Sequence, residues 1–316
     1  MNYSRLALIL TIFIFSGCTT VNVYKNPLTE LSSSVTQTKV AIDIISSEVY
    51  KAKVRNKALD AAIESRRFGT NDLENVIPPE YLKIRLHGLQ LIEELSVRLL
   101  QVIDSNAGSN AAASIEKTGT KAQALAKELN NTSVANYAGP VSNLAGTIIR
   151  IYDNNKREEI LEKGIKDGIP KAKEIVELLK KDFTLKSPID IQDALIDELK
   201  QTVTEKIGLY DEMLTYQKGL SKEEKKNPEL ISKRLKAIEE IIIAQDALNA
   251  LNSQSVIDTL SDLEITLDQL KDLVNSNNNP ANFSVFVSKL TNFSNSSVLL
   301  LEAANAVKKA GEVSSK

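Results

Sequence analysis

Apolar residues recur every three or four positions along most of this chain, which is the period of an amphipathic α-helix. The clearest case predicts a long helix from about Thr29 to Arg67. Two apolar tracks run through it at seven-residue intervals, as in a coiled-coil seam. Their members are Val35, Ile42, Val49 and Ile63 on one track, and Leu31, Ile45, Ala52 and Leu59 on the other.

Two polar residues interrupt these tracks, Asn56 on the first and Thr38 on the second. A polar residue in a helix seam costs stability and can fix the register of packing. The alternative is that the helix edge faces water at these positions. The sequence leaves both interpretations open.

Helix-breaking residues divide the rest of the chain into further predicted helices. Pro78-Pro79 precedes one helix, Gly164 and Gly168-Ile169-Pro170 mark a break, and a polar loop spans 275–280. Small residues dominate 106–149, and a polar turn is expected at 130–132. The predicted helices cover about 80–105, 111–129, 133–163, 170–182, 188–218, 228–251, 256–275 and 281–309.

This pattern predicts an all-α protein: an elongated bundle of about six to eight helices, possibly arranged as two packed subbundles. A strand-rich domain of this size would need alternating β-branched residues and many turns, which long stretches of the chain lack. We expect an N-terminal helical part at 29–183 and a C-terminal helical part at 184–316. The chain has no Trp and a single Cys, so Leu, Ile, Val and Ala must supply most of the core without a disulfide.

The N-terminus carries a different signal. The apolar run from Leu6 to Phe15 is ten residues long, which is too short for a membrane span of about 20 residues but fits the core of a signal peptide. Ser16-Gly17-Cys18 follows it and resembles the lipobox of bacterial lipoproteins. The resemblance implies cleavage after residue 17, attachment of acyl chains such as palmitate to Cys18, and a place in the cell envelope.

The residue after Cys18 is Thr19 rather than Asp. In a Gram-negative host the resemblance then implies the outer membrane, with the protein facing the periplasm. We expect residues 18–28 to form a lipidated tether, which spans at most about 35 Å when extended. The body would therefore lie close to the membrane.

The net charge and the residue counts exclude several classes of function. The formal net charge of −2 gives no indication of a nucleic-acid partner. His87 is the only histidine, which excludes paired-histidine zinc motifs, and we interpret it as structural. No catalytic motif, metal-binding motif or cofactor motif is found. The sequence therefore predicts a non-enzymatic protein that needs no cofactor.

An aromatic stripe on the last predicted helix is the candidate partner-binding site. It consists of Phe283, Phe286 and Phe293, with Leu290 between them. The stripe is either part of the core or an exposed recognition face, since aromatic anchors dominate many interfaces.

We expect a lipid-anchored envelope protein that binds another protein or braces an assembly. One alternative is an immunity-type protein that neutralises an imported toxin. Another is a membrane-active, pore-forming-like helical protein that inserts the segment from Val134 to Tyr152.

Overall fold

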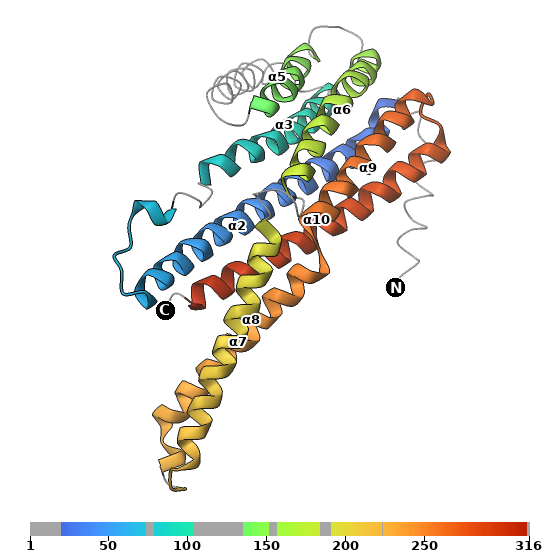
Figure 1. The fold of residues 1–316 in the computed structure, drawn as a ribbon. Coiled ribbons are helices and arrows are strands. Elements are labelled where there is room, and N and C mark those ends of the chain that lie inside the picture. The colour runs from blue at the N-terminus through green and yellow to red at the C-terminus, as the bar shows by residue number, and fades with distance from the viewer. Residues whose placement is uncertain are drawn as a thin grey trace, which may run out of the picture.

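The structure, a computed structural model, describes residues 20–73, 79–103, 135–151, 157–183, 191–222 and 224–314. It is an all-α bundle, and the described residues include no strand (Figure 1). The long helices are α2 (Lys25–Ile63), α3 (Pro79–Ile103), α5 (Ala135–Arg150), α6 (Arg157–Asp182), α7 (Ile191–Lys218), α8 (Pro228–Ser253), α9 (Val256–Asn275) and α10 (Pro280–Ser314). Short 3₁₀ turns are η2 (Thr20–Tyr24), η3 (Thr70–Leu73) and η4 (Glu224–Lys226).

Helix α2 lies at the centre of the bundle, with α3 packed on one side and α10 on the other (Figure 1). The predicted seam of α2 is confirmed wherever its side chains are described. Its buried members are Leu31, Val35, Ile42, Ile45, Val49 and Ala52. One apolar cluster extends from Tyr24 in η2 to Ala310 in α10. The expected parts at 29–183 and 184–316 therefore share one core.

Thr38 does not face water. It is fully buried, and its hydroxyl donates to the Ser34 carbonyl at 2.9 Å within its own helix. The same hydroxyl lies 3.0 Å from the Ser297 hydroxyl of α10. This polar pair fixes how α2 and α10 face each other, because any sliding of the helices would separate two buried hydroxyls.

The expected extended tether is mostly helical. Residues 20–24 form η2, and α2 begins at Lys25 rather than Thr29. Pro27 does not prevent this, because the first turn of a helix does not need its N–H groups for internal hydrogen bonds. Tyr24 and Leu28 are buried, and the Tyr24 hydroxyl donates to the Asn278 side chain in the loop between α9 and α10. Only Thr19 separates Cys18 from this folded segment.

The expected break at 164–170 is wrong. Helix α6 runs from Arg157 to Asp182 without interruption, through Gly164, Gly168 and Pro170. The two glycines face α3: a Cβ added at Gly168 would lie 2.9 Å from the Leu95 side chain, and one at Gly164 would lie 2.9 Å from Leu99. These glycines serve close helix packing rather than chain reversal. In the same way α10 continues to Ser314, beyond its expected end at about 309.

The other predicted helices are found near their expected bounds where the structure describes them, including α3, α7, α8 and α9. The loop after α9 is also confirmed, with Asn277 and Asn278 at positive φ, a conformation that asparagine tolerates better than most residues. The predicted helix at 111–129 and the turn at 130–132 lie outside the described residues.

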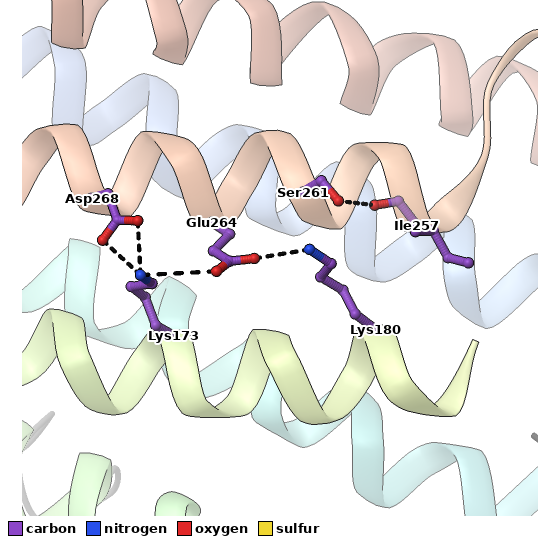
Figure 2. A network of polar contacts seen from close by, with 6 residues as sticks. All are labelled: Lys173, Lys180, Ile257, Ser261, Glu264 and Asp268. Carbon is purple, nitrogen blue, oxygen red and sulfur yellow. Dashed lines mark hydrogen bonds and ion pairs between the residues drawn. The ribbon is translucent and has the colours of Figure 1, made fainter. Parts of the chain in front are cut away.

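Helices α6 and α9 are joined by a row of ion pairs across their outer edges (Figure 2). Lys173 donates to both carboxylate oxygens of Asp268 at 2.7 Å and lies 3.8 Å from Glu264. Lys180 donates to Glu264 at 2.9 Å. The hydrogen bond to Asp268 raises the pKa of Lys173. Partly exposed pairs of this kind contribute at most about 1 kcal/mol each, so the buried leucines of α9 do more to hold the two helices together.

Candidate protein-binding surface

Helices α7 and α8 form a hairpin that leaves the bundle and projects from it (Figure 1). Its base is well packed: Leu195, Leu199 and Val203 of α7 are buried, and so is α8 from Ile243 to Leu251 on its inner side, against α10. The segments 204–218 and 228–242 lie beyond this base and are mostly exposed or half-buried. Each has 15 residues, which corresponds to roughly 22 Å of helix.

The hairpin is held together by its inner face. Lys206 of α7 donates to Glu240 of α8 at 2.6 Å, and both side chains are largely covered. The tip is closed by Asn227, whose side chain accepts from the Glu229 N–H at 2.9 Å, while Pro228 occupies the first turn of α8. Such caps stabilise a helix start by about 1 kcal/mol. The hairpin is therefore held in a regular helical conformation up to its tip by these contacts.

A second apolar face of α8 points away from the bundle. We call it the outer stripe, and it consists of Ile231, Leu235, Ile238 and Ile242. Their spacing of four, three and four residues places them in one line along the helix. Ile231 is 40% exposed, Leu235 62% and Ile242 53%, while Ile238 is half-buried. An amphipathic surface helix normally buries its apolar stripe. Helix α8 has two apolar faces, and the outer stripe remains exposed to solvent.

Other exposed apolar residues do not form such a line in sequence. In the remaining described helices they are Val40, Ile149, Ile207, Tyr216, Ile265, Val285, Val298 and Leu299. No two of these exposed residues lie three, four or seven positions apart within one helix, whereas Ile231, Leu235 and Ile242 do. On α7, the apolar residues at such a spacing from Ile207 are the buried Val203 and the half-buried Tyr210 and Leu214. Isolated exposed apolar side chains are ordinary on protein surfaces and need no explanation. A regularly spaced stripe on a projecting element is typical of an interaction site.

The tip of the hairpin is basic although the whole chain is slightly acidic. Between Lys218 and Lys236 there are seven basic and three acidic residues. Lys218, Lys222 and Lys225 are exposed. Two further lysines of α8 have nearby carboxylates, since Lys233 lies 2.8 Å from Glu229 and Lys236 lies 3.9 Å from Glu240. The excess of positive charge thus lies next to the N-terminal end of the outer stripe.

The predicted aromatic site is part of the core. Phe286 and Phe293 are both 0% exposed, and Phe283 is half-buried against the same apolar cluster. The core interpretation of this stripe therefore accounts for all three side chains, and no aromatic recognition face is formed. Val134, the first residue of the candidate insertion segment, lies outside the described residues, and so does Tyr152. Between them α5 packs into the bundle through Val141, Leu144 and Ile148.

Cys18 lies outside the described residues, and His87 is half-buried on α3. Within the described ranges, no group of three His, Cys, Asp or Glu residues could hold a metal ion. No described helix is both long and apolar enough to cross a membrane.

One polar cluster joins three helices inside the bundle. Asp182 of α6 accepts from the Arg85 guanidinium of α3 and, at 2.5 Å, from the Tyr137 hydroxyl of α5. The Arg85 guanidinium also lies over the Tyr137 ring, 5.6 Å from its centre. Burial, together with the hydrogen bond to Asp182, raises the pKa of Tyr137 far above its usual value. The carboxylate is occupied by two donors of its own chain, so this cluster fastens α5 to the bundle.

A hollow of about 230 Å³ lies between α5 and α6. Its lining has two bases and two acids, and so no net charge that would favour one kind of ligand. The lining residues are Thr147, Arg150, Ile151, Glu159, Ile160, Lys163, Gly164 and Asp167.

Comparison of the chain with protein-family models, with curated proteins and with solved structures found no match. The functional candidate therefore comes from the chain's own residues. Sequence reasoning did not single out the outer stripe, although a signal was present. Helix α8 carries two apolar tracks one residue apart, and the run Ile241-Ile242-Ile243 places isoleucine on several faces at once.

Proposed function

We propose that this chain is a lipid-anchored cell-envelope protein that binds another protein through the outer stripe and catalyses no reaction. The exposed, regularly spaced apolar line on the projecting hairpin is the observation that carries the proposal. An apolar helix face of this kind is open to packing by another helix, because association would remove its isoleucine and leucine side chains from water.

The lipobox-like segment supports the envelope location. On this proposal Cys18 carries acyl chains, and in a Gram-negative host the protein is held at the outer membrane and faces the periplasm. Two or more chains on one residue make a long-lived anchor, because each buried methylene contributes about 0.8 kcal/mol. Detergent phase partitioning tests the anchor: the full-length chain should enter the detergent phase, and a chain that begins after Cys18 should remain in the aqueous phase.

Site-specific photo-crosslinking tests the binding surface. A photoreactive residue placed at Leu235 in the full-length, membrane-bound chain should give a discrete protein adduct in the native host. The matched control is the same residue at Leu299 of α10, which is 48% exposed but lies outside the hairpin. An adduct at 235 and none at 299 supports the proposal. Absence of any adduct at 235, or the same adducts at both positions, would contradict it.

A further inference from the structure

We infer that the partner of the outer stripe is an acidic amphipathic helix, which packs along α8 as a third helix of the hairpin. This inference rests on the proposed protein-binding function and names the chemistry of the partner. Three observations carry it: the shape of the stripe, the charge of the tip, and the position of the hairpin in the molecule.

The shape of the stripe fits a helix. Ile231, Leu235, Ile238 and Ile242 follow the four-three-four spacing by which one helix packs its side chains between those of another. The opposite side of the same helix is already used in this way, since α8 packs against α7 and α10. A third helix on the outer stripe would cover the second apolar track, and α8 would then be apolar only where it is buried.

The positive charge of the hairpin tip favours an acidic partner. Seven basic residues stand against three acidic ones between Lys218 and Lys236, and the exposed lysines Lys218, Lys222 and Lys225 lie near the start of the stripe. A partner helix that runs along the stripe toward the tip would meet this positive field. Acidic side chains on that helix are attracted, and basic side chains are repelled.

The position of the hairpin favours a protein over a lipid surface. The tip lies at the opposite end of the molecule from η2, the described segment nearest to Cys18 in the chain (Figure 1). The stripe is also a single line of side chains with Glu239 directly after Ile238, whereas helices that lie on membranes present a broad apolar face. A helix is the occupant that matches both features.

A matched pair of peptides tests the inference on the mature, lipidated chain in detergent. Each peptide has three heptads with leucine at the two seam positions. One carries glutamate at every flanking position, the other carries lysine there, and like charges keep both from pairing with themselves. We expect the acidic peptide to bind at least tenfold more tightly than the basic one, by fluorescence anisotropy, and its affinity to fall with added salt.

Two variants locate the binding. Leu235→Gln combined with Ile242→Gln should weaken the acidic peptide at least tenfold, while the control pair Val285→Gln and Leu299→Gln on α10 should leave it unchanged. Replacement of Lys218, Lys222 and Lys225 by glutamate should reverse the preference toward the basic peptide. Circular dichroism confirms that each variant keeps its helix content.

Several outcomes would overturn the inference. They are failure of the acidic peptide to bind, equal binding of the basic peptide, binding that survives the stripe substitutions, stripe-dependent binding to anionic vesicles in place of the peptide, and stripe-dependent dimerisation in sedimentation. If crosslinking at 235 still captures a protein while the acidic peptide fails, the proposed function stands and only the acidic-helix inference is lost. If crosslinking also fails, both are lost.

Discussion

Asp182 shows how single residues decide which helices of this bundle stay together. Its carboxylate accepts from Arg85 on α3 and from Tyr137 on α5, so one side chain of α6 fastens two other helices. Thr38 and Ser297 do the same for α2 and α10 with neutral hydroxyl groups. Loss of the Tyr137 hydroxyl leaves the partly buried Asp182 carboxylate short of one donor, which costs about 1–3 kcal/mol. Thr38 and Ser297 differ, because each hydroxyl also donates to a backbone carbonyl of its own helix.

Tyr137→Phe should therefore destabilise the protein by about 1–2 kcal/mol, because Asp182 loses one donor and keeps Arg85. Urea unfolding followed by circular dichroism measures the change. Tyr216→Phe is the matched control, since Tyr216 is 69% exposed and no cross-helix bond is at stake. Equal stability of the two variants would show that the Tyr137 hydroxyl does not hold α5.

The same residue predicts a pH dependence. Because the folded-state pKa of Tyr137 is raised, its contribution to stability is complete below the unfolded tyrosine value of about 10 and is lost as the pH rises above it. The difference in unfolding free energy between wild type and Tyr137→Phe should therefore shrink above about pH 10. A difference that grew with pH would contradict the raised pKa.

At the scale of helices, close approach of α3 and α6 depends on glycine. Gly164 and Gly168 of α6 sit against Leu99 and Leu95 of α3, and Gly88 of α3 sits against Ile175 of α6. A helix interior normally disfavours glycine by about 1 kcal/mol relative to alanine. Here that cost is offset by the tight packing of two helices over a buried leucine and isoleucine face.

Gly168→Leu should destabilise the protein by about 1–3 kcal/mol, because the new side chain must displace Leu95 in a packed core. The matched control is Gly208→Leu on the projecting part of α7, where an added Cβ meets no atom within 4 Å. That change should stabilise α7 by a few tenths to about 1 kcal/mol through helix propensity. Thermal unfolding of both variants measures the contrast, and equal effects at the two glycines would disprove the packing role of Gly168.

These glycines also show where sequence reasoning stops. Apolar periodicity located the seam of α2 and the approximate bounds of α7, α8 and α9, because it depends on which side of one helix is buried. Gly168-Ile169-Pro170 reads locally as a break, and only contact with α3 shows that these residues continue a helix. Pro170 removes one N–H donor from the helix, yet α6 is continuous through it, with Ile169 and Ala172 buried next to it.

The outer stripe was missed for a related reason. Phe286 and Phe293 form as regular a stripe as Ile231, Leu235 and Ile242, yet the first set is buried and the second is exposed. Periodicity says that a helix has an apolar side, and it does not say whether another helix of the chain covers it. That depends on α7 and α8 leaving the bundle, which is a property of the tertiary arrangement.

At the scale of the whole molecule, one end of the fold lies near the proposed anchor at Cys18 and the other end lies far from it. Tyr24 lies six residues after Cys18 in the chain and binds Asn278 of the α9–α10 loop, so this loop belongs to the end nearest the proposed anchor. Six residues span at most about 22 Å. The hairpin tip lies at the other end (Figure 1), beyond a bundle whose helix α2 alone is about 58 Å long.

This arrangement predicts how the lipidated protein stands on a membrane. A fluorophore at Asn277→Cys should be strongly quenched by spin-labelled lipid headgroups, and one at Lys222→Cys should be quenched little. Selective labelling is possible because the chain has no cysteine other than Cys18, which lipid occupies on the proposed function. A chain that begins after Cys18 and carries either label should show no quenching, since it lacks the anchor. Stronger quenching at 222 than at 277 would place the basic tip on the membrane, and would contradict both the orientation and the acidic-helix partner.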